Sequence, residues 1–217
     1  KNIIVSAGAG SGKTRVLTER VKHLVDIGVS PENIVCITFT NKAADEMRNR
    51  LEDVVGIGDA FIGTIHSFAN RILKASGEKY DLLTNEKEIE IVRYLISKYA
   101  KHVTHEDYMH FLDLRHLVKL GAKDESVLKE EFAPSIMYEL NVFYGGKPNN
   151  YDKKFYPDNL YTICKRRGII TFDELLIKCT NYFKSINAKV EYLLVDELQD
   201  IGMNEYEFIM ALNADNN

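Results

Sequence analysis

A glycine-rich run close to the first residue limits the folds that this chain can adopt. The apolar residues Ile3-Ile4-Val5 lead into the run Ala7-Gly8-Ala9-Gly10-Ser11-Gly12-Lys13-Thr14, and a helix-forming stretch, 15–26, follows. A strand that feeds a Gly-rich turn and then a helix is the setting of a phosphate-binding loop. Such a loop turns successive backbone N–H groups toward an anion at the N-terminus of the helix. The run therefore predicts an α/β fold that binds a nucleoside triphosphate.

Each position of this run has an expected role. The backbone from Ala7 to Gly12 would surround the phosphates, although Ala7 stands where the strict pattern has a glycine. Lys13 would reach the β- and γ-phosphates, and the Thr14 hydroxyl would ligate Mg²⁺. A Gly-rich loop that only connects a strand to a helix is the alternative, and the Lys-Thr pair in register argues against it.

The first third of the chain alternates strand and helix signals. Residues 34–39 and 60–64 are short apolar runs rich in β-formers, and helical patterns follow them at 41–55 and 67–75. Strands and helices that alternate at this length predict a parallel sheet covered on both faces. The same pattern resumes near the end, where strand 192–195 precedes helix 204–212.

The middle of the chain has a different character. Residues 84–186 contain several helical patterns and no strand signal, and Asn85 with Glu88 is a candidate cap for the first helix. Pro134 should kink or divide the helical stretch 126–144, and Thr171-x-x-Glu174 is a capping box for a later helix. We expect residues 1–76 and 187–217 to form one discontinuous α/β domain, and 77–186 to form an all-helical insert.

Two adjacent carboxylates follow the last predicted strand. Asp196 and Glu197 come directly after Tyr192-Leu193-Leu194-Val195. Ligands of open parallel sheets lie beyond the carboxyl ends of the strands, where the Gly-rich loop would also lie. Asp196 would hold Mg²⁺, and Glu197 would accept a proton from the attacking water. The sequence thus predicts one site assembled from both ends of the chain.

Four segments in this order carry a family resemblance. They are Ala7 to Arg15, Ile37-Thr38-Phe39-Thr40-Asn41-Lys42-Ala43-Ala44, Gly63-Thr64-Ile65-His66-Ser67-Phe68 and Val195-Asp196-Glu197-Leu198-Gln199-Asp200. In order and spacing they resemble the UvrD/Rep-type superfamily 1 DNA helicases. The resemblance covers nearly the whole chain and implies a RecA-like first motor domain interrupted by a helical subdomain.

The resemblance also implies roles for individual residues. Phe39, Thr40, Asn41, Thr64, His66 and Phe68 would line a groove for single-stranded DNA. Gln199 would contact the γ-phosphate region and couple hydrolysis to DNA binding, and Arg15 would lie near the adenine. Aromatic platforms hold bases without reading them, as translocation requires. Phe39 and Phe68 could instead be core residues, and Thr40 with Asn41 could be only a helix cap.

The resemblance further implies ATP and Mg²⁺ as cofactors and single-stranded DNA, or a single/double-strand junction, as partner. A second motor domain with its arginines would follow residue 217, and the adenine-reading segment would precede Lys1. On this reading the chain is an excised first motor domain, expected to bind Mg-ATP weakly, to hydrolyse it poorly alone, and to be monomeric. Leu198 stands where the family has an aromatic residue.

Composition indicates which partners, metal sites and cell compartments the sequence favours. The formal net charge of −4 argues against a globally basic nucleic-acid coat, and a local basic groove stays possible. Three cysteines without paired spacing, Cys36, Cys164 and Cys179, indicate neither a disulfide framework nor a zinc site. No apolar run has the length of a membrane span and no signal peptide is evident, so we expect a cytoplasmic protein.

Three other functions are compatible with parts of the sequence. A helicase–nuclease subunit of the recombination type shares the same four segments. A P-loop kinase would use the helical insert as a lid, but it needs neither the segment around Phe39 nor the one around His66. A non-catalytic module would keep the loop as a scaffold, which the intact Lys13, Thr14, Asp196 and Glu197 argue against.

Overall fold

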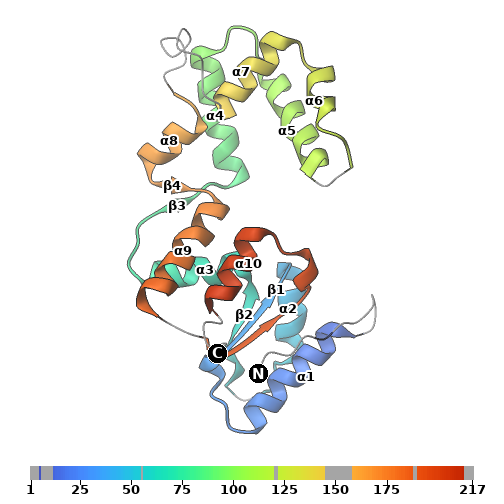
Figure 1. The fold of residues 1–217 in the computed structure, drawn as a ribbon, viewed down its shortest axis with the longest axis vertical. Helices are drawn as coiled ribbons and strands as arrows, with labels where there is room; N and C mark the ends of the chain where they lie inside the picture. Colours follow the sequence, from blue (N-terminus) through green and yellow to red (C-terminus); the bar gives the residue numbers. More distant parts are fainter. Residues whose placement is uncertain are drawn as a thin grey trace. The chain divides into compact units, whose positions relative to one another are not determined.

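The chain folds into two compact units in a computed structural model that describes residues 5, 12–54, 56–119, 122–144, 158–187 and 190–212. One unit comprises residues 1–79 and 171–217, and the other comprises residues 80–170. Figure 1 shows the helices and strands of each unit. We describe the units one at a time.

The first unit contains a parallel sheet in the order β2-β1-β5 among the described residues. Its strands are β1 (Ile34–Thr38), β2 (Phe61–Thr64) and β5 (Tyr192–Val195). Val35 of β1 pairs with Phe61 of β2 and with Leu193 of β5, so the three strands end at nearly the same level. The parallel sheet and the predicted limits of strands 34–39, 60–64 and 192–195 are confirmed, within one residue at each end, whereas Ile3 and Ile4 of the apolar run before the Gly-rich loop lie outside the described residues.

Helices cover both faces of this sheet (Figure 1). Helices α1 (Lys13–Asp26) and α2 (Asn41–Arg50) pack against the even-numbered side chains of β1 around Ile34 and Cys36. Side chains alternate along a strand, so Val35 and Ile37 face the opposite layer. That layer contains α3 (Ile65–Ala75), α9 (Phe172–Ile186) and α10 (Met203–Leu212).

Local sequence signals explain where these helices begin. The Thr40 hydroxyl accepts the N–H of Ala43 and caps α2, and the Thr64 hydroxyl accepts that of Ser67 and caps α3. Thr171 and Glu174 form the predicted capping box of α9. Short 3-10 helices, η1 (Pro31–Asn33), η2 (Ile57–Asp59) and η4 (Leu198–Asp200), occupy connections of the same unit.

The second unit is a helical domain with its own core. It contains α4 (Asn85–Tyr99), α5 (His105–Lys119), α6 (Ser126–Glu131), α7 (Pro134–Tyr144) and α8 (Leu160–Arg167). Pro134 divides α6 from α7, as predicted. Fully buried aromatic and aliphatic side chains of α4, α5 and α7, among them Leu95, Tyr108 and Phe143, form the centre of the core.

Three expectations for this part of the chain were wrong. Thr84, not Asn85, caps α4, because its hydroxyl accepts the N–H of Lys87. Two short parallel strands, β3 (Asp81–Leu82) and β4 (Ile169–Ile170), pair within a region where we expected no strand. The predicted division at 186/187 also differs from that of the structure at 170/171. Helix α9 belongs to the sheet-containing unit because it packs against α3 and α10.

Candidate nucleotide site and nucleic-acid surface

The two ends of the chain meet at the carboxyl end of the sheet. The Lys13 ammonium, in the first turn of α1, lies 2.8 Å from a carboxylate oxygen of Glu197, although 184 positions separate the residues. The neighbouring Thr14 hydroxyl donates to Asp196 Oδ2 at 3.4 Å. The residues Ala7, Gly8, Ala9, Gly10 and Ser11 of the predicted loop lie outside the described part of the structure. Gly12, at φ 88°, leads into α1.

Strand β5 holds Asp196 in place. The Asp196 N–H donates to the carbonyl of Ile37 at 2.8 Å and so extends the ladder between β1 and β5 by one bond. Asp196 is 7% exposed, and its Oδ1 accepts the N–H of Glu197 at 3.0 Å. A carboxylate fixed by the backbone on one oxygen leaves the other directed at Thr14.

Glu197 adopts a backbone conformation that is uncommon for a residue with a side chain. Its φ of 51° and ψ of 45° lie in the left-handed region, between β5 and η4. This turn brings the carboxylate to Lys13, and the amide of Gln199 donates to the same oxygen, Oε2. Gln199 also donates to Asp200 at 3.3 Å. Strained backbone is common at functional positions, which supports a role for this turn beyond packing.

The ion pair sets the charge of both partners. The hydrogen bond from Lys13, with a second one from Gln199, holds the pKa of Glu197 below its ordinary value. The hydrogen bond to Glu197 raises the pKa of Lys13, with further attraction from Asp196 and Asp200. Both groups are therefore charged at neutral pH. A carboxylate held in this way is a weak proton acceptor until the lysine leaves it.

Thr14 and Asp196 suit a magnesium ion. Their oxygens are the hard donors that Mg²⁺ prefers, and adjacent ligands of an octahedral Mg²⁺ lie about 3 Å apart. The observed separation of 3.4 Å is close to that distance. Residues from α1 and β5 could therefore share one cation with little movement.

A second group of predicted residues lies at the same edge of the sheet, after β1 and β2. Thr38 and Thr64 are direct partners in the ladder, so the residues that follow them leave the sheet side by side. Phe39 is 59% exposed, and Thr40 and Asn41 are exposed at the start of α2. His66 is half-buried on the first turn of α3. Phe39, Thr40, Asn41, Thr64 and His66 together are called the β1–β2 surface below.

Phe68 does not belong to the β1–β2 surface, which corrects our expectation. Its side chain is 4% exposed, and its ring lies 4.7 Å from that of Phe61 and 6.3 Å from that of Phe208. On α3, Phe68 points to the sheet, whereas His66, two positions earlier, points away from it. A buried ring cannot stack on a base.

Phe172 extends the β1–β2 surface, and the sequence reasoning missed it. It is 44% exposed at the first position of α9, and its ring meets that of His66 edge to face at 5.3 Å. The capping box of Thr171 and Glu174 fixes this end of the helix. The sequence signal that could have found it is a large aromatic residue directly after a capping residue. A side chain at the first position of a helix can stay exposed and need not pack in the core.

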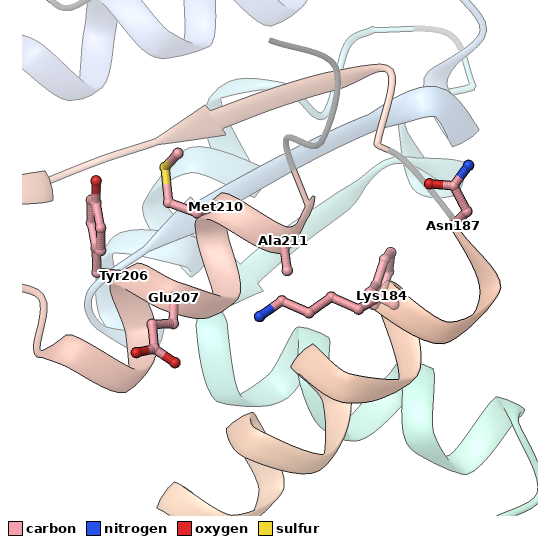
Figure 2. A pocket seen from close by; sticks show the side chains of 7 residues that line it. Lys184, Asn187, Tyr206, Glu207, Met210 and Ala211 are labelled. Carbon is pink, nitrogen blue, oxygen red and sulfur yellow. The ribbon is translucent and has the colours of Figure 1, made fainter. Parts of the chain in front are cut away.

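Arg15 is exposed in the first turn of α1, and its carbonyl accepts the hydroxyl of Thr18 at 2.8 Å. A hollow of about 360 Å³ lies elsewhere in this unit, between α9 and α10. Figure 2 shows Lys184 of α9 and Tyr206, Glu207 and Met210 of α10 around it. None of the described candidate residues lines this hollow, so we give it no part in the chemistry.

The fold and the site define the class of the protein. A parallel sheet covered on both faces, with Lys-Thr at the start of α1 facing Asp-Glu at the end of β5, is the arrangement of a RecA-like P-loop domain. A family model of the UvrD/REP helicase N-terminal domain matches residues 1–217. The chain therefore belongs to this family.

Curated relatives agree with the family match. DNA helicase II of Escherichia coli (strain K12) is 29% identical over 230 residues, which cover 99% of this chain and 30% of that protein. The ATP-dependent DNA helicase PcrA of Bacillus subtilis (strain 168) is 30% identical, with 97% and 29% covered. PcrA of Leuconostoc citreum is 34% identical with the same coverage. The chain spans about 30% of the length of these relatives.

No helix among the described residues is both long and apolar enough to cross a membrane.

Proposed function

We propose that this chain is the first motor domain of an ATP-dependent DNA helicase or translocase. It would bind Mg-ATP at the site around Lys13 and Glu197 and single-stranded DNA, or a single/double-strand junction, at the β1–β2 surface. The observation that carries the proposal is the meeting of Lys13 and Thr14 with Asp196 and Glu197 across 184 and 182 positions of sequence. The names of the relatives, all DNA helicases, support it.

The residues of the site have distinct roles in this proposal. Lys13 would move from Glu197 to the terminal phosphates, because a triphosphate offers it more negative charge than one carboxylate. Glu197, freed from the lysine, would accept the proton of the attacking water, and Gln199 would keep the carboxylate oriented. Thr14 and Asp196 would hold Mg²⁺, which supplies charge neutralisation on the phosphates.

The two proposed sites share one edge of the sheet. Asp196 donates its N–H to Ile37, and Phe39 follows two positions later on the same strand end. The proposed nucleotide carboxylates and the proposed DNA-binding turn are thus adjacent along β5 and β1. This proximity is consistent with a motor in which DNA binding affects hydrolysis.

Measuring ATP hydrolysis by the intact protein that contains this domain, with and without an oligothymidylate, tests the proposal. We expect Lys13→Ala to weaken binding of a fluorescent ATP analogue, and Glu197→Gln to keep binding and stop turnover. Lys22→Ala is the matched control, since Lys22 lies on the same helix and pairs with Glu19 on the surface at 3.4 Å. Wild-type hydrolysis by both site variants would reject the proposal, as would nucleotide binding that is equally lost in Lys22→Ala.

A further inference from the structure

A hydroxyl group lies at the end of a strand that is otherwise apolar and buried. All five residues of β1 are buried, and Thr38 is 2% exposed. Valine has nearly the same shape and suits a buried strand at least as well, since a buried hydroxyl costs free energy unless it is hydrogen-bonded. The Thr38 hydroxyl is bonded: it donates to the carbonyl of Thr40 at 3.0 Å.

The carbonyl of Thr40 is a junction between the strand and the helix. It also accepts the N–H of Ala44 at 3.1 Å, which is the first bond of α2. The Thr40 side chain caps the same helix through Ala43. The Thr38 hydroxyl therefore connects the end of β1 to the first turn of α2. The two residues between these elements, Phe39 and Thr40, form a closed turn.

The closed turn directs Phe39 outward. Its neighbours Thr38 and Thr40 are joined across it, and its side chain is 59% exposed. The neighbouring strand has no such turn, because β2 ends at Thr64, which itself caps α3. Two residues, Phe39 and Thr40, separate β1 from α2, whereas α3 begins directly after Thr64. The hydrogen bond from Thr38 to Thr40 therefore has no counterpart after β2 because no turn has to be held there.

We propose that Thr38 is a positioning residue for nucleic-acid binding, because its hydroxyl holds the turn in the conformation that presents the Phe39 ring. This inference rests on the proposed function of the β1–β2 surface. Thr38 itself is buried beneath this surface. It acts only through the turn formed by Phe39 and Thr40.

The chain offers a reporter for this turn, since it contains no tryptophan. Phe39→Trp introduces one indole at the turn. Its fluorescence can be excited selectively, without exciting the tyrosines, and the measurement needs no DNA. Adding Thr38→Val removes the hydroxyl and keeps the branched shape, whereas Thr38→Ser keeps the hydroxyl. We expect Thr38→Val to lower the fluorescence anisotropy of the indole and Thr38→Ser to leave it unchanged.

Binding of a labelled oligothymidylate, measured without the Phe39→Trp substitution, gives the second readout. We expect Thr38→Val to raise Kd about fivefold, as for one lost hydrogen bond, and Thr38→Ser to restore the wild-type value. Unchanged thermal unfolding of both variants shows that the sheet is intact.

The two readouts separate the two proposals. An indole anisotropy that Thr38→Val does not change would overturn the positioning role. A wild-type protein that binds no oligothymidylate would reject the function of the β1–β2 surface, while the indole comparison would still decide whether Thr38 holds the turn. A looser turn with unchanged Kd would overturn the role of Thr38 in binding.

Discussion

The ion pair between Lys13 and Glu197 makes stability depend on pH in a predictable direction. The lowered pKa of Glu197 stabilises the fold above the ordinary value of 4.5, and this contribution disappears as the pH falls through the lowered value. The raised pKa of Lys13 stabilises the fold below 10.5, and this contribution disappears as the pH rises through the raised value. The ion pair thus adds to the free energy of unfolding between these two pH limits.

Comparing the free energy of unfolding of wild type and Lys13→Met across pH tests this behaviour. We expect a difference near neutral pH that shrinks toward both extremes. Lys22→Met is the control, because its partner Glu19 is exposed and the pair is 3.4 Å apart. A difference that does not vary with pH would show that the pair does not form in solution.

Three phenylalanines near the end of the sheet should respond differently to truncation. Phe39→Ala and Phe172→Ala should each weaken oligothymidylate binding by about 1–3 kcal/mol, the value of one base stacked on an aromatic ring, with little loss of stability. Phe68→Ala should instead destabilise the fold by about 3–5 kcal/mol, because it leaves a cavity beside Phe61 and Phe208.

Tyr161→Ala is the control for the exposed rings, since Tyr161 is 57% exposed in the other unit. Anisotropy of a labelled oligonucleotide and urea denaturation of each variant separate the two effects. Binding by Phe39→Ala and Phe172→Ala equal to that of Tyr161→Ala would contradict the aromatic contribution.

At the residue level, the predicted meeting of two segments from opposite ends of the chain agrees with the structure, whereas the chemical roles of these residues stay predictions. The expectation that Lys13 and Thr14 meet Asp196 and Glu197 agrees with the described distances, because strand order brings carboxyl ends to one edge. The exposure of aromatic residues could not be predicted in the same way. Phe39 and Phe68 both follow short strands, and only the packing of α3 against the sheet decides that one ring is outside and the other inside.

At the level of elements, two local signals gave accurate helix limits, although the cap predicted at Asn85 was wrong by one residue. The capping box at Thr171 and the break at Pro134 gave helix limits within about two residues, because both act through local bonds or sterics. Helix α2 ends at Arg50 rather than near residue 55, and a turn follows there. The helical character of α9 was predicted correctly, but its neighbours were not. An amphipathic pattern shows that a helix has a buried face and does not identify what covers it.

In the helical unit, one carboxylate connects three elements. Glu139 of α7 is 1% exposed and accepts the backbone N–H groups of Lys101, His102 and Val103, at 2.9–3.2 Å. These groups belong to the connection between α4 and α5. The side chain therefore satisfies donors that no helix or strand satisfies in this connection.

We expect Glu139→Ala to destabilise the protein by about 3–5 kcal/mol, because it removes the charged acceptor of three backbone N–H groups, and that of Val103 is buried. Glu139→Gln keeps one acceptor oxygen and should cost less. Glu130→Ala, on the exposed side of α6, should change stability by less than about 0.5 kcal/mol. Urea denaturation and amide exchange at residues 101–103 provide the measurements. Slow exchange at these amides in Glu139→Ala would contradict the role of the carboxylate.

For the whole molecule, each unit has a core of its own. Among the described residues, the core of the sheet-containing unit around α1 and α2 includes Val21, Met47 and Leu194 and no residue from 80–170. The core of the helical unit includes Leu95, Tyr108 and Phe143 and, in the part of the chain that the structure describes, no residue from outside that range. When two units have separate cores, deleting one unit does not expose the apolar core of the other to water.

The helical unit should therefore be removable. Asp81 and Ile169 are partners in the ladder of β3 and β4, so the chain enters and leaves this unit about 5 Å apart. A Gly/Ser linker of about eight residues can join Lys79 to Thr171.

Because the site of Lys13, Thr14, Asp196 and Glu197 lies outside the deleted range, we expect the shortened protein to unfold cooperatively and to bind a fluorescent ATP analogue within about twofold of the full chain. The same deletion with Lys13→Ala is the control for specific binding. Loss of cooperative unfolding would show that the sheet-containing unit depends on the helical one, whereas cooperative unfolding without nucleotide binding would place part of the site in residues 80–170.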